Sequence, residues 1–339
     1  MRLDFVDTLA PRPYSAHPAS LAGLGGTEMT LIRVAQALRC EGTIEVRQRV
    51  RQNREAMPGL AFVPFDPAVP ADAFVVINSW KVASMLRRSH PDARILLWLH
   101  VFPGRHNRAM GDDLVRKRIE VVCVSRSHAR WVRTYLGHDR IDIHTIPNPV
   151  DDDLLPDATC RDPDLLLFAS SPHKGLDQVF HAFAAARRQI PSLRLAFADP
   201  GYLRWPTGSP PAGSTDLGRL SQQELHGWMR RSLCLFYPQT RFAETFGLVI
   251  AEANAVGCPA LVHRGLGAND EVAGPQQCLD ATEPGQIIDR LRQWRRRFPI
   301  IHTNPDFRLA RVQAAWRDLL LKDCEASRGT ALRMEGATA

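Results

Sequence analysis

Short apolar runs rich in Val, Ile and Leu recur along the whole chain, separated by segments of helix length. Few of the runs alternate cleanly with polar residues, which is typical of strands buried on both faces. Such strands belong to a parallel sheet, because its helical crossovers cover both faces. The expected strands are Met1–Val6, Ala73–Asn78, Arg94–Trp98, Val121–Val124, Asp142–Ile146, Asp164–Ala169, Leu193–Ala198, Leu233–Tyr237 and Ala260–His263.

The segments between these runs carry helical patterns. Strand and helix alternate in both halves of the chain, which predicts an α/β fold with two doubly wound parallel-sheet domains. A length of 339 residues fits two domains of roughly 150 residues each. Ligands of such folds bind at the carboxyl ends of the strands, so we expect a cleft between two facing sheets. The expected helices are Thr27–Cys40, Ser79–Ser89, Ser127–Leu136, Leu176–Gln189, Ser221–Arg230, Phe246–Val256 and Phe307–Leu321, the last crossing back to the first domain.

Proline and acidic residues mark the expected domain boundary. Residues 147–163 contain four prolines and the acidic run Asp151–Asp153, a composition typical of a linker. The stretch Pro200–Ser214, dense in Gly, Pro and Ser, is expected to be a surface loop. The expected division is a first domain over residues 1–150, a linker over 151–163, a second domain over 164–326 and a disordered tail over 327–339.

Composition excludes several classes of protein. With 45% hydrophobic residues, the chain can build sizeable cores and is not disordered as a whole. Apolar runs such as Ile95–Leu99 are far shorter than the roughly 20 residues that cross a bilayer. Asp4 and Asp7 interrupt the apolar core that a secretion signal needs. The 7 cysteines are scattered without a CxxC pair, which indicates buried free thiols and a cytoplasmic location.

The segment that follows the strand ending at Tyr237 carries the most specific pattern in the chain. A loop with Glu244 leads into a helix that begins near Gly247 and stops at Gly257, where Pro259 bars its continuation. The free N–H groups at the start of this helix form an anion site suited to a diphosphate. Glycine at 247 removes a side chain where a phosphate or sugar would press on the backbone.

Two carboxylates flank this anion site. An isolated glutamate is most simply a solvent-exposed residue, and that interpretation suits Glu244 and Glu252 taken singly. Glu252, however, lies in an almost wholly apolar helix, and a helix that is apolar all round is buried. A buried carboxylate needs hydrogen bonds. Each of the two could accept a pair of hydroxyl hydrogens, one pair from a ribose and the other from a transferred sugar.

Between Glu244 and Pro259 the sequence resembles the Glu-x7-Glu signature of retaining glycosyltransferases of the GT-B fold, specifically glycosyltransferase family 4 (glycosyl transferases group 1). The loop before Glu244 is two residues longer than in the family pattern, counted from Pro238. The matching positions are Glu244, Phe246, Gly247, Glu252, Ala253, Ala255, Gly257 and Pro259.

The resemblance implies the GT-B fold, with two Rossmann-like domains facing each other across a cleft. It implies an enzyme that moves a sugar from a nucleoside-diphosphate-sugar to a hydroxyl of a glycan or lipid-linked acceptor, with retention of configuration, in cell-surface glycolipid or polysaccharide synthesis. It also implies catalysis without a cofactor or metal. Asp151–Asp153 satisfies the metal-binding pattern Asp-x-Asp, but it lies in the expected linker and not at a strand end.

The same resemblance assigns roles to single residues. Lys174, in a Lys-Gly pair after the strand that ends near Ala169, takes the place of the family's diphosphate-binding basic residue. The family usually has an arginine where this chain has Ala169, so one charge is missing. His100 and Glu244 are the implied catalytic residues, which orient the transferred sugar, while Glu252 holds the ribose. The implied donor-binding residues are Gly25, Gly26, Lys174, Phe246, Gly247, Leu248 and Glu252.

The chain carries 43 Lys+Arg against 36 Asp+Glu, a formal net charge of +7. Clusters of basic residues most often form solvated faces. Those in the first domain also suit weak, peripheral contact with an anionic membrane at its inner face. No recognition fold for nucleic acid is present, so we expect no such partner. The clusters are Arg47–Arg54, Arg87–Arg88, Arg105–Arg133 and Arg292–Arg297.

Two other functions stay open at this point. One is a nucleotide-sugar epimerase on the same fold, which would need acid and base groups facing the sugar and would release its product without an acceptor. The other is a non-catalytic nucleotide-sugar-binding partner subunit, which the missing arginine at position 169 makes conceivable.

Overall fold

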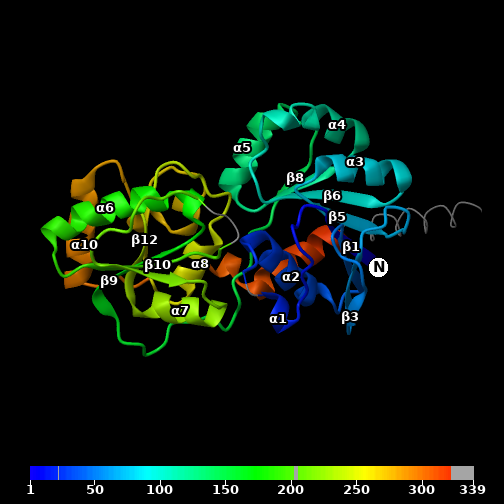
Figure 1. Ribbon diagram of the computed structural model, residues 1–339. Helices are drawn as coiled ribbons and strands as arrows, with labels where there is room; N and C mark the ends of the chain where they lie inside the picture. Colours follow the sequence, from blue (N-terminus) through cyan, green and yellow to red (C-terminus); the bar gives the residue numbers. More distant parts are fainter. Residues whose placement is uncertain (22, 202–204, 322–339) are drawn as a thin grey trace, which may run out of the picture.

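The computed structural model describes residues 1–21, 23–201 and 205–321, and these contain two separate sheets (Figure 1). The first sheet has eight strands in the order β3-β4-β2-β1-β5-β6-β7-β8, and all its strand pairs are parallel except β3–β4. The strands are β1 (Arg2–Asp7), β2 (Thr43–Gln48), β3 (Glu55–Met57), β4 (Leu60–Pro64), β5 (Ala73–Ile77), β6 (Arg94–Leu99), β7 (Glu120–Cys123) and β8 (Ile143–Thr145).

Helices cover both faces of this sheet, and we call the sheet with its helices the first unit. Helices α3, α4 and α5 pack on one face, and α2 lies on the other (Figure 1). The helices are α1 (Pro18–Leu21), α2 (Gly26–Leu38), α3 (Trp80–Ser89), the short η1 (Arg105–Asn107), α4 (Met110–Lys117) and α5 (Arg126–Leu136).

The second sheet is parallel throughout and has six strands in the order β11-β10-β9-β12-β13-β14. With its helices it forms the second unit. Numbered within the sheet the order is 3-2-1-4-5-6, that of doubly wound nucleotide-binding folds, so the direction of winding reverses between β9 and β12. The strands are β9 (Asp162–Ala169), β10 (Arg194–Ala198), β11 (Ser214–Gly218), β12 (Ser232–Tyr237), β13 (Ala260–His263) and β14 (Cys278–Leu279).

Helices α6 and α10 pack together on one face of this second sheet, and α7 packs with α8 on the opposite face (Figure 1). The helices are η2 (Pro172–Lys174), α6 (Leu176–Gln189), α7 (Gln222–Arg231), α8 (Leu248–Ala255), α9 (Asn269–Val272), η3 (Pro275–Gln277), α10 (Pro284–Arg296) and η4 (Pro305–Phe307). The expected α/β architecture with two doubly wound sheets is therefore confirmed.

Several strands and helices were not predicted from the sequence: β2, β3, β4, β11, β14, α1, α4, α9 and α10. Strand β2 shows why, since Glu45 and Arg47 are charged and yet almost wholly buried. Arg47 donates to Asp4 Oδ2 at 2.5 Å and to Glu45 Oε2 at 2.7 Å, so the burial is paired. Arg54 donates to Glu45 Oε1 at 2.7 Å. The basic cluster Arg47–Arg54 is therefore not a purely solvated face, which corrects that expectation.

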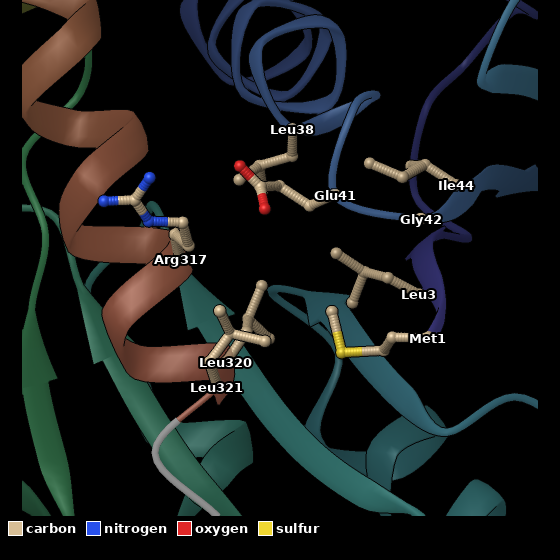
Figure 2. A pocket seen from close by; sticks show the side chains of 9 residues that line it. All are labelled: Met1, Leu3, Leu38, Glu41, Gly42, Ile44, Arg317, Leu320 and Leu321. Carbon is tan, nitrogen blue, oxygen red and sulfur yellow. The ribbon is translucent and has the colours of Figure 1, made fainter. Parts of the chain in front are cut away.

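The chain crosses back to the first unit after the second sheet, as expected. Residues 309–321 form a helix whose Trp316 is fully buried against Phe5 and Trp98 of the first sheet. Farther along this helix, Leu320 and Leu321 face Leu3 across a small apolar cavity of about 10 Å³, room for one water molecule (Figure 2). The expected tail, residues 327–339, lies outside the described residues.

Within the described ranges, no helix combines the length and apolar character needed to cross a bilayer. The described cysteines are free. Those that are buried are Cys123, Cys234, Cys258 and Cys278, and those that are exposed are Cys40 and Cys160.

Candidate functional site

Lys174 and Glu244 meet where the winding of the second sheet reverses. Lys174 ends the turn η2 after β9, and Glu244 lies in the loop after β12. The ammonium Nζ lies 2.9 Å from Glu244 Oε1 and 3.0 Å from Oε2, and it also lies over the ring of Phe242. The carboxyl ends of two neighbouring strands thus present a paired cation and anion at the place where ligands of such sheets bind.

Glu244 is held from several directions. Its side chain is almost wholly buried, and Tyr237 donates its hydroxyl to Oε1 at 3.0 Å. Its carbonyl accepts the N–H of Ala268 at 2.9 Å. Gly267, at φ +58°, lies so close that a Cβ there would come within 2.3 Å of the Glu244 carbonyl oxygen. Only glycine fits this position, so the loop after β13 fixes the backbone of Glu244.

The start of α8 is built as the sequence predicts. Gly247 has φ +90°, a left-handed conformation that favours glycine, and it precedes the first helical residue, Leu248. Phe246 is buried against Phe307, which anchors the loop on the apolar side. The first N–H groups of α8, which have no partner within the helix, therefore lie in a turn beside Glu244.

The glycine loop of the first unit lies opposite this turn. Gly25 precedes α2 and Gly26 opens it, and a Cβ added to Gly26 would lie 3.9 Å from the side chain of Leu248 at the start of α8. Glu28, in the first turn of α2, is largely buried; burial raises its pKa, while hydrogen bonds from the backbone of Glu28 and Gly25 oppose the rise. The two glycines and α8 thus come together across the two units.

Glu252 is buried, as expected, but its partner was not predicted. Arg33 of α2 donates from Nη1 and Nη2 to Glu252 Oε1 at 3.1 and 3.0 Å. The same guanidinium donates to the carbonyl of Pro149 and lies 3.1 Å from Asp151. The second carboxylate oxygen, Oε2, faces His226 Nε2 at 4.0 Å. One oxygen of Glu252 is therefore committed to the first unit.

A cavity of about 290 Å³ lies between α7 and the segment after Val150. His226 lines it, and its Nε2 has no hydrogen-bond partner within the described part of the chain. Burial lowers the pKa of His226, and the nearby Glu252 opposes this shift. The other lining residues are Asp151, Asp153, Leu154, Gln223 and Arg230.

His100 directly follows β6, as expected, and its ring packs on Trp98 with centroids 4.5 Å apart. The backbone N–H of His100 donates to Asn78 Oδ1 at 2.7 Å, whereas the ring atom Nε2 is buried without a hydrogen-bond partner among the described residues. Burial, with a smaller contribution from His128, lowers the pKa of His100 to about 3. The ring is therefore a neutral hydrogen-bonding group at physiological pH.

Two hydrogen bonds join the units beside these residues. Thr245 donates its hydroxyl to the carbonyl of His100 at 2.8 Å, and Ser125 donates its hydroxyl to the carbonyl of Thr245 at 2.6 Å. Ser125 is also the N-cap of α5. Sequence reasoning missed both residues, although the polar position between Glu244 and Phe246 was a signal that could have indicated Thr245.

Glu271 of α9 makes a third connection between the units. Its carboxylate accepts the N–H groups of Arg126 and Ser127 at 3.0 and 2.9 Å and the hydroxyl of Ser127 at 3.0 Å. A carboxylate of the second unit therefore caps α5 of the first, where the helix dipole favours a negative charge. Sequence reasoning missed Glu271 as well.

The position of the missing arginine, Ala169, ends β9. Beyond it, His173 contacts Ser171 Oγ at 2.9 Å, and burial together with Lys174 lowers the pKa of His173. Within the described ranges, no group of three or more His, Cys, Asp or Glu side chains could hold a metal ion. Asp151 pairs with Arg33, and Asp152 accepts the N–H of Ala310.

The basic clusters differ in their surroundings. Arg87 donates to four backbone carbonyls, so its guanidinium has a structural role. Arg105, Arg108 and Arg133 are exposed. Trp131 is 41% exposed, stacked on Tyr135 and in edge contact with Phe102, and Val101 is 49% exposed. The first unit thus exposes aromatic, apolar and basic side chains in the segments that follow β6 and β7.

Residues 165–296 match the family described as glycosyl transferases group 1. No curated protein matches the chain. Among solved structures, AviGT4, a glycosyltransferase involved in avilamycin A biosynthesis, is 18% identical, with a TM-score of 0.59 over 93% of this chain and 91% of that chain.

Two other solved structures span nearly the whole chain. The α,α-trehalose-phosphate synthase (UDP-forming) from Burkholderia vietnamiensis is 13% identical, with a TM-score of 0.63 over 97% of this chain and 99% of that chain. A glycosyltransferase from Rickettsia africae ESF-5 is 12% identical, with a TM-score of 0.63 over 94% and 93%. At these identities the likeness shows the fold, which is GT-B.

Proposed function

We propose that this chain, which has the GT-B fold and matches glycosyl transferases group 1 over residues 165–296, is a glycosyltransferase. In this proposal it transfers a sugar from a nucleoside-diphosphate-sugar to a hydroxyl of a glycan or lipid-linked acceptor, with retention of configuration, in cell-surface glycolipid or polysaccharide synthesis. The observation that carries the proposal is the pairing of Lys174 with Glu244 beside the start of α8. In keeping with it, the trehalose-phosphate synthase of the same fold forms UDP.

The departing diphosphate is the largest charge that such a reaction develops, and preorganised cations and N–H groups stabilise it most effectively. Lys174 supplies the cation. The N–H groups at the start of α8, at Gly247 and Leu248, supply the helix terminus, and the Gly25–Gly26 loop approaches from the first unit. In the proposal Lys174 turns from Glu244 toward the diphosphate when the donor binds, and no metal takes part.

Glu244 and His100 would then orient the transferred sugar. Release from Lys174 frees carboxylate oxygens of Glu244 to accept sugar hydroxyls, while Tyr237 keeps the side chain in place. The neutral His100 ring offers its unpartnered Nε2 to another hydroxyl. In this proposal both residues bind sugar hydroxyls and neither attacks the anomeric carbon, so we place attack on the same face of the sugar as the departing diphosphate.

The ribose is assigned to Glu252 Oε2, the oxygen that Arg33 leaves uncommitted. His226 lies 4.0 Å from this oxygen and lines the neighbouring cavity. The ribose diol would therefore approach Glu252 from the side of α7. Arg33 neutralises part of the carboxylate charge and holds its orientation.

The decisive experiment mixes purified protein with a panel of nucleoside-diphosphate-sugars and hydroxyl acceptors, including lipid-linked ones, and follows release of the nucleoside diphosphate. We expect acceptor-dependent release that Glu244→Ala and Lys174→Ala reduce by at least tenfold. NMR of the product reports the anomeric configuration, and an inverted product would contradict retention. Normal release in both variants would contradict the assignment of the site.

The same assay separates the two other functions. An epimerase would convert the donor sugar without any acceptor and without releasing a nucleoside diphosphate. A binding subunit would bind the donor but release nothing with any acceptor in the panel.

We also propose that the first unit contacts an anionic membrane peripherally through the exposed residues Trp131, Arg105, Arg108 and Arg133. Trp131 suits the interfacial region, and each arginine near the membrane surface would contribute about 1 kcal/mol of attraction. Binding to vesicles with anionic lipid should weaken at high salt and in an Arg105→Gln/Arg108→Gln/Arg133→Gln variant. The charge-matched control is Arg292→Gln/Arg296→Gln/Arg297→Gln in the second unit. Absence of binding at low salt would end the proposal.

A further inference from the structure

The two residues assigned to the transferred sugar lie in different units, so their separation depends on how the units are joined. His100 belongs to the first unit and Glu244 to the second. Side-chain hydrogen bonds that cross between the units beside them are made by His100, Ser125, Ser127, Thr245 and Glu271, which we call the inter-unit clasp.

Thr245 occupies the central position of the clasp. It directly follows Glu244 in the chain and donates to the carbonyl of His100 at 2.8 Å. Its own carbonyl accepts the hydroxyl of Ser125 at 2.6 Å. A single residue therefore ties the loop of Glu244 both to the strand end that carries His100 and to the N-cap of α5.

The loop after β13 closes the connection. Ala268 donates its N–H to the Glu244 carbonyl, and Gly267 packs against the same peptide. Glu271, three residues beyond Ala268, caps α5 through Ser127. The Ala268 N–H therefore holds the backbone of Glu244 from within the second unit. Thr245 and Glu271, on either side of this bond, both contact residues at the start of α5 in the first unit.

We propose that Thr245 is a positioning residue, which sets the separation of Glu244 and His100 by bonding the two units together in the reactive arrangement. This inference rests on the proposed function of Glu244 and His100. The Thr245 hydroxyl touches neither substrate nor the reacting atoms in this account, and it acts through the carbonyl of His100. Misplacement of a reacting group by 1 Å can cost about 100-fold in rate, so loss of one such bond should be visible in kcat.

The test compares Thr245→Val, which replaces the hydroxyl by a methyl group of similar size, with Thr245→Ser, which keeps the hydroxyl. We expect Thr245→Val to lower kcat for transfer about 10- to 100-fold, with the donor KM changed less than threefold, and Thr245→Ser to recover most of the loss. Thr134→Val is the matched control, because the hydroxyl of the exposed Thr134 donates to the carbonyl of Arg130 within α5.

A kcat within twofold of wild type in Thr245→Val would overturn the proposal, as would failure of Thr245→Ser to recover activity. If Thr245→Val does not fold, Glu271→Gln tests the other end of the clasp, and it should lower kcat with the donor KM retained. A readout independent of turnover is small-angle X-ray scattering, in which Thr245→Val combined with Glu271→Gln should enlarge the radius of gyration. An unchanged radius contradicts the clasp, whereas absence of transfer by the wild-type chain contradicts the proposed function.

Discussion

Arg33 on α2 and Glu252 on α8 form a buried ion pair across the two units, with both guanidinium Nη atoms on one carboxylate oxygen. The side chains are only 7% and 4% exposed, so neither charge is solvated once its partner is lost. Burying a charge is costly unless it is paired, and removal of one partner from such a pair costs about 3–5 kcal/mol. The contact between the units therefore depends on this pair more than on exposed ion pairs elsewhere.

Arg33→Met should lower the stability of the chain by several kcal/mol, because Glu252 stays buried without a cation. Glu252→Gln in the same chain should recover part of the loss, since the uncompensated charge is gone. The measurement is the urea midpoint of the two single variants and the double variant, with the exposed Arg39→Met as control. Additivity of the two single effects within about 0.5 kcal/mol would mean that the two residues are not coupled.

Lys174→Met should lower kcat/KM for the donor about 100- to 1000-fold, because the departing diphosphate loses its nearest cation. Lys81→Met is the control, since Lys81 is an exposed lysine on α3. Release of nucleoside diphosphate at several donor concentrations separates kcat from KM. Equal kcat/KM values in the two variants would remove Lys174 from the site.

The stability of the chain should fall with acid partly through His100. Its folded pKa of about 3 lies below the value of 6.5 for an unperturbed histidine, so the unfolded chain binds the proton more readily between these values. The contribution of His100 is therefore fully present above pH 6.5 and is lost as pH falls toward 3, at no more than about 1.4 kcal/mol per pH unit. Unfolding midpoints between pH 4 and 8 should fall less steeply in His100→Gln than in wild type. Parallel curves would contradict the burial of a neutral imidazole.

Trp316→Ala should destabilise the first unit by about 3–5 kcal/mol, the usual cost of truncating a buried aromatic side chain. The indole is fully buried between Phe5 and Trp98, although it belongs to the helix that follows the second sheet. Trp205→Ala is the control, because Trp205 is 52% exposed. The measurement is the melting temperature of each variant in thermal unfolding. Equal melting temperatures in the two variants would rule out a structural role for this helix.

Local sequence patterns predicted those parts of the fold and site whose causes are local. The apolar character of α8 predicted that Glu252 is buried, and the glycine and proline around it predicted where the helix begins and ends. The positions of Lys174 and His100 after buried strands predicted that they lie at strand ends. In each case the signal is contained in a few consecutive residues.

Partners from distant parts of the chain could not be predicted in this way. Arg33 lies 219 residues from Glu252 in the sequence, and its own segment is a helix with Glu28 as its other charged residue. The burial of Arg47 on β2 depends on Asp4 of the neighbouring strand. Thr245 is one polar residue in a loop until the first unit supplies Ser125 and the carbonyl of His100.

The return of the chain to the first unit also constrains how such proteins can recombine. The two units are connected near Val150 and again near Arg308, where these two residues form an isolated β-bridge. A gene fusion with a single junction near Val150 would bring the helix of residues 309–321 from one parent onto the Phe5 and Trp98 surface of the other. Exchange of the second unit between relatives therefore needs two junctions, so that Trp316 is inherited together with the sheet that buries it.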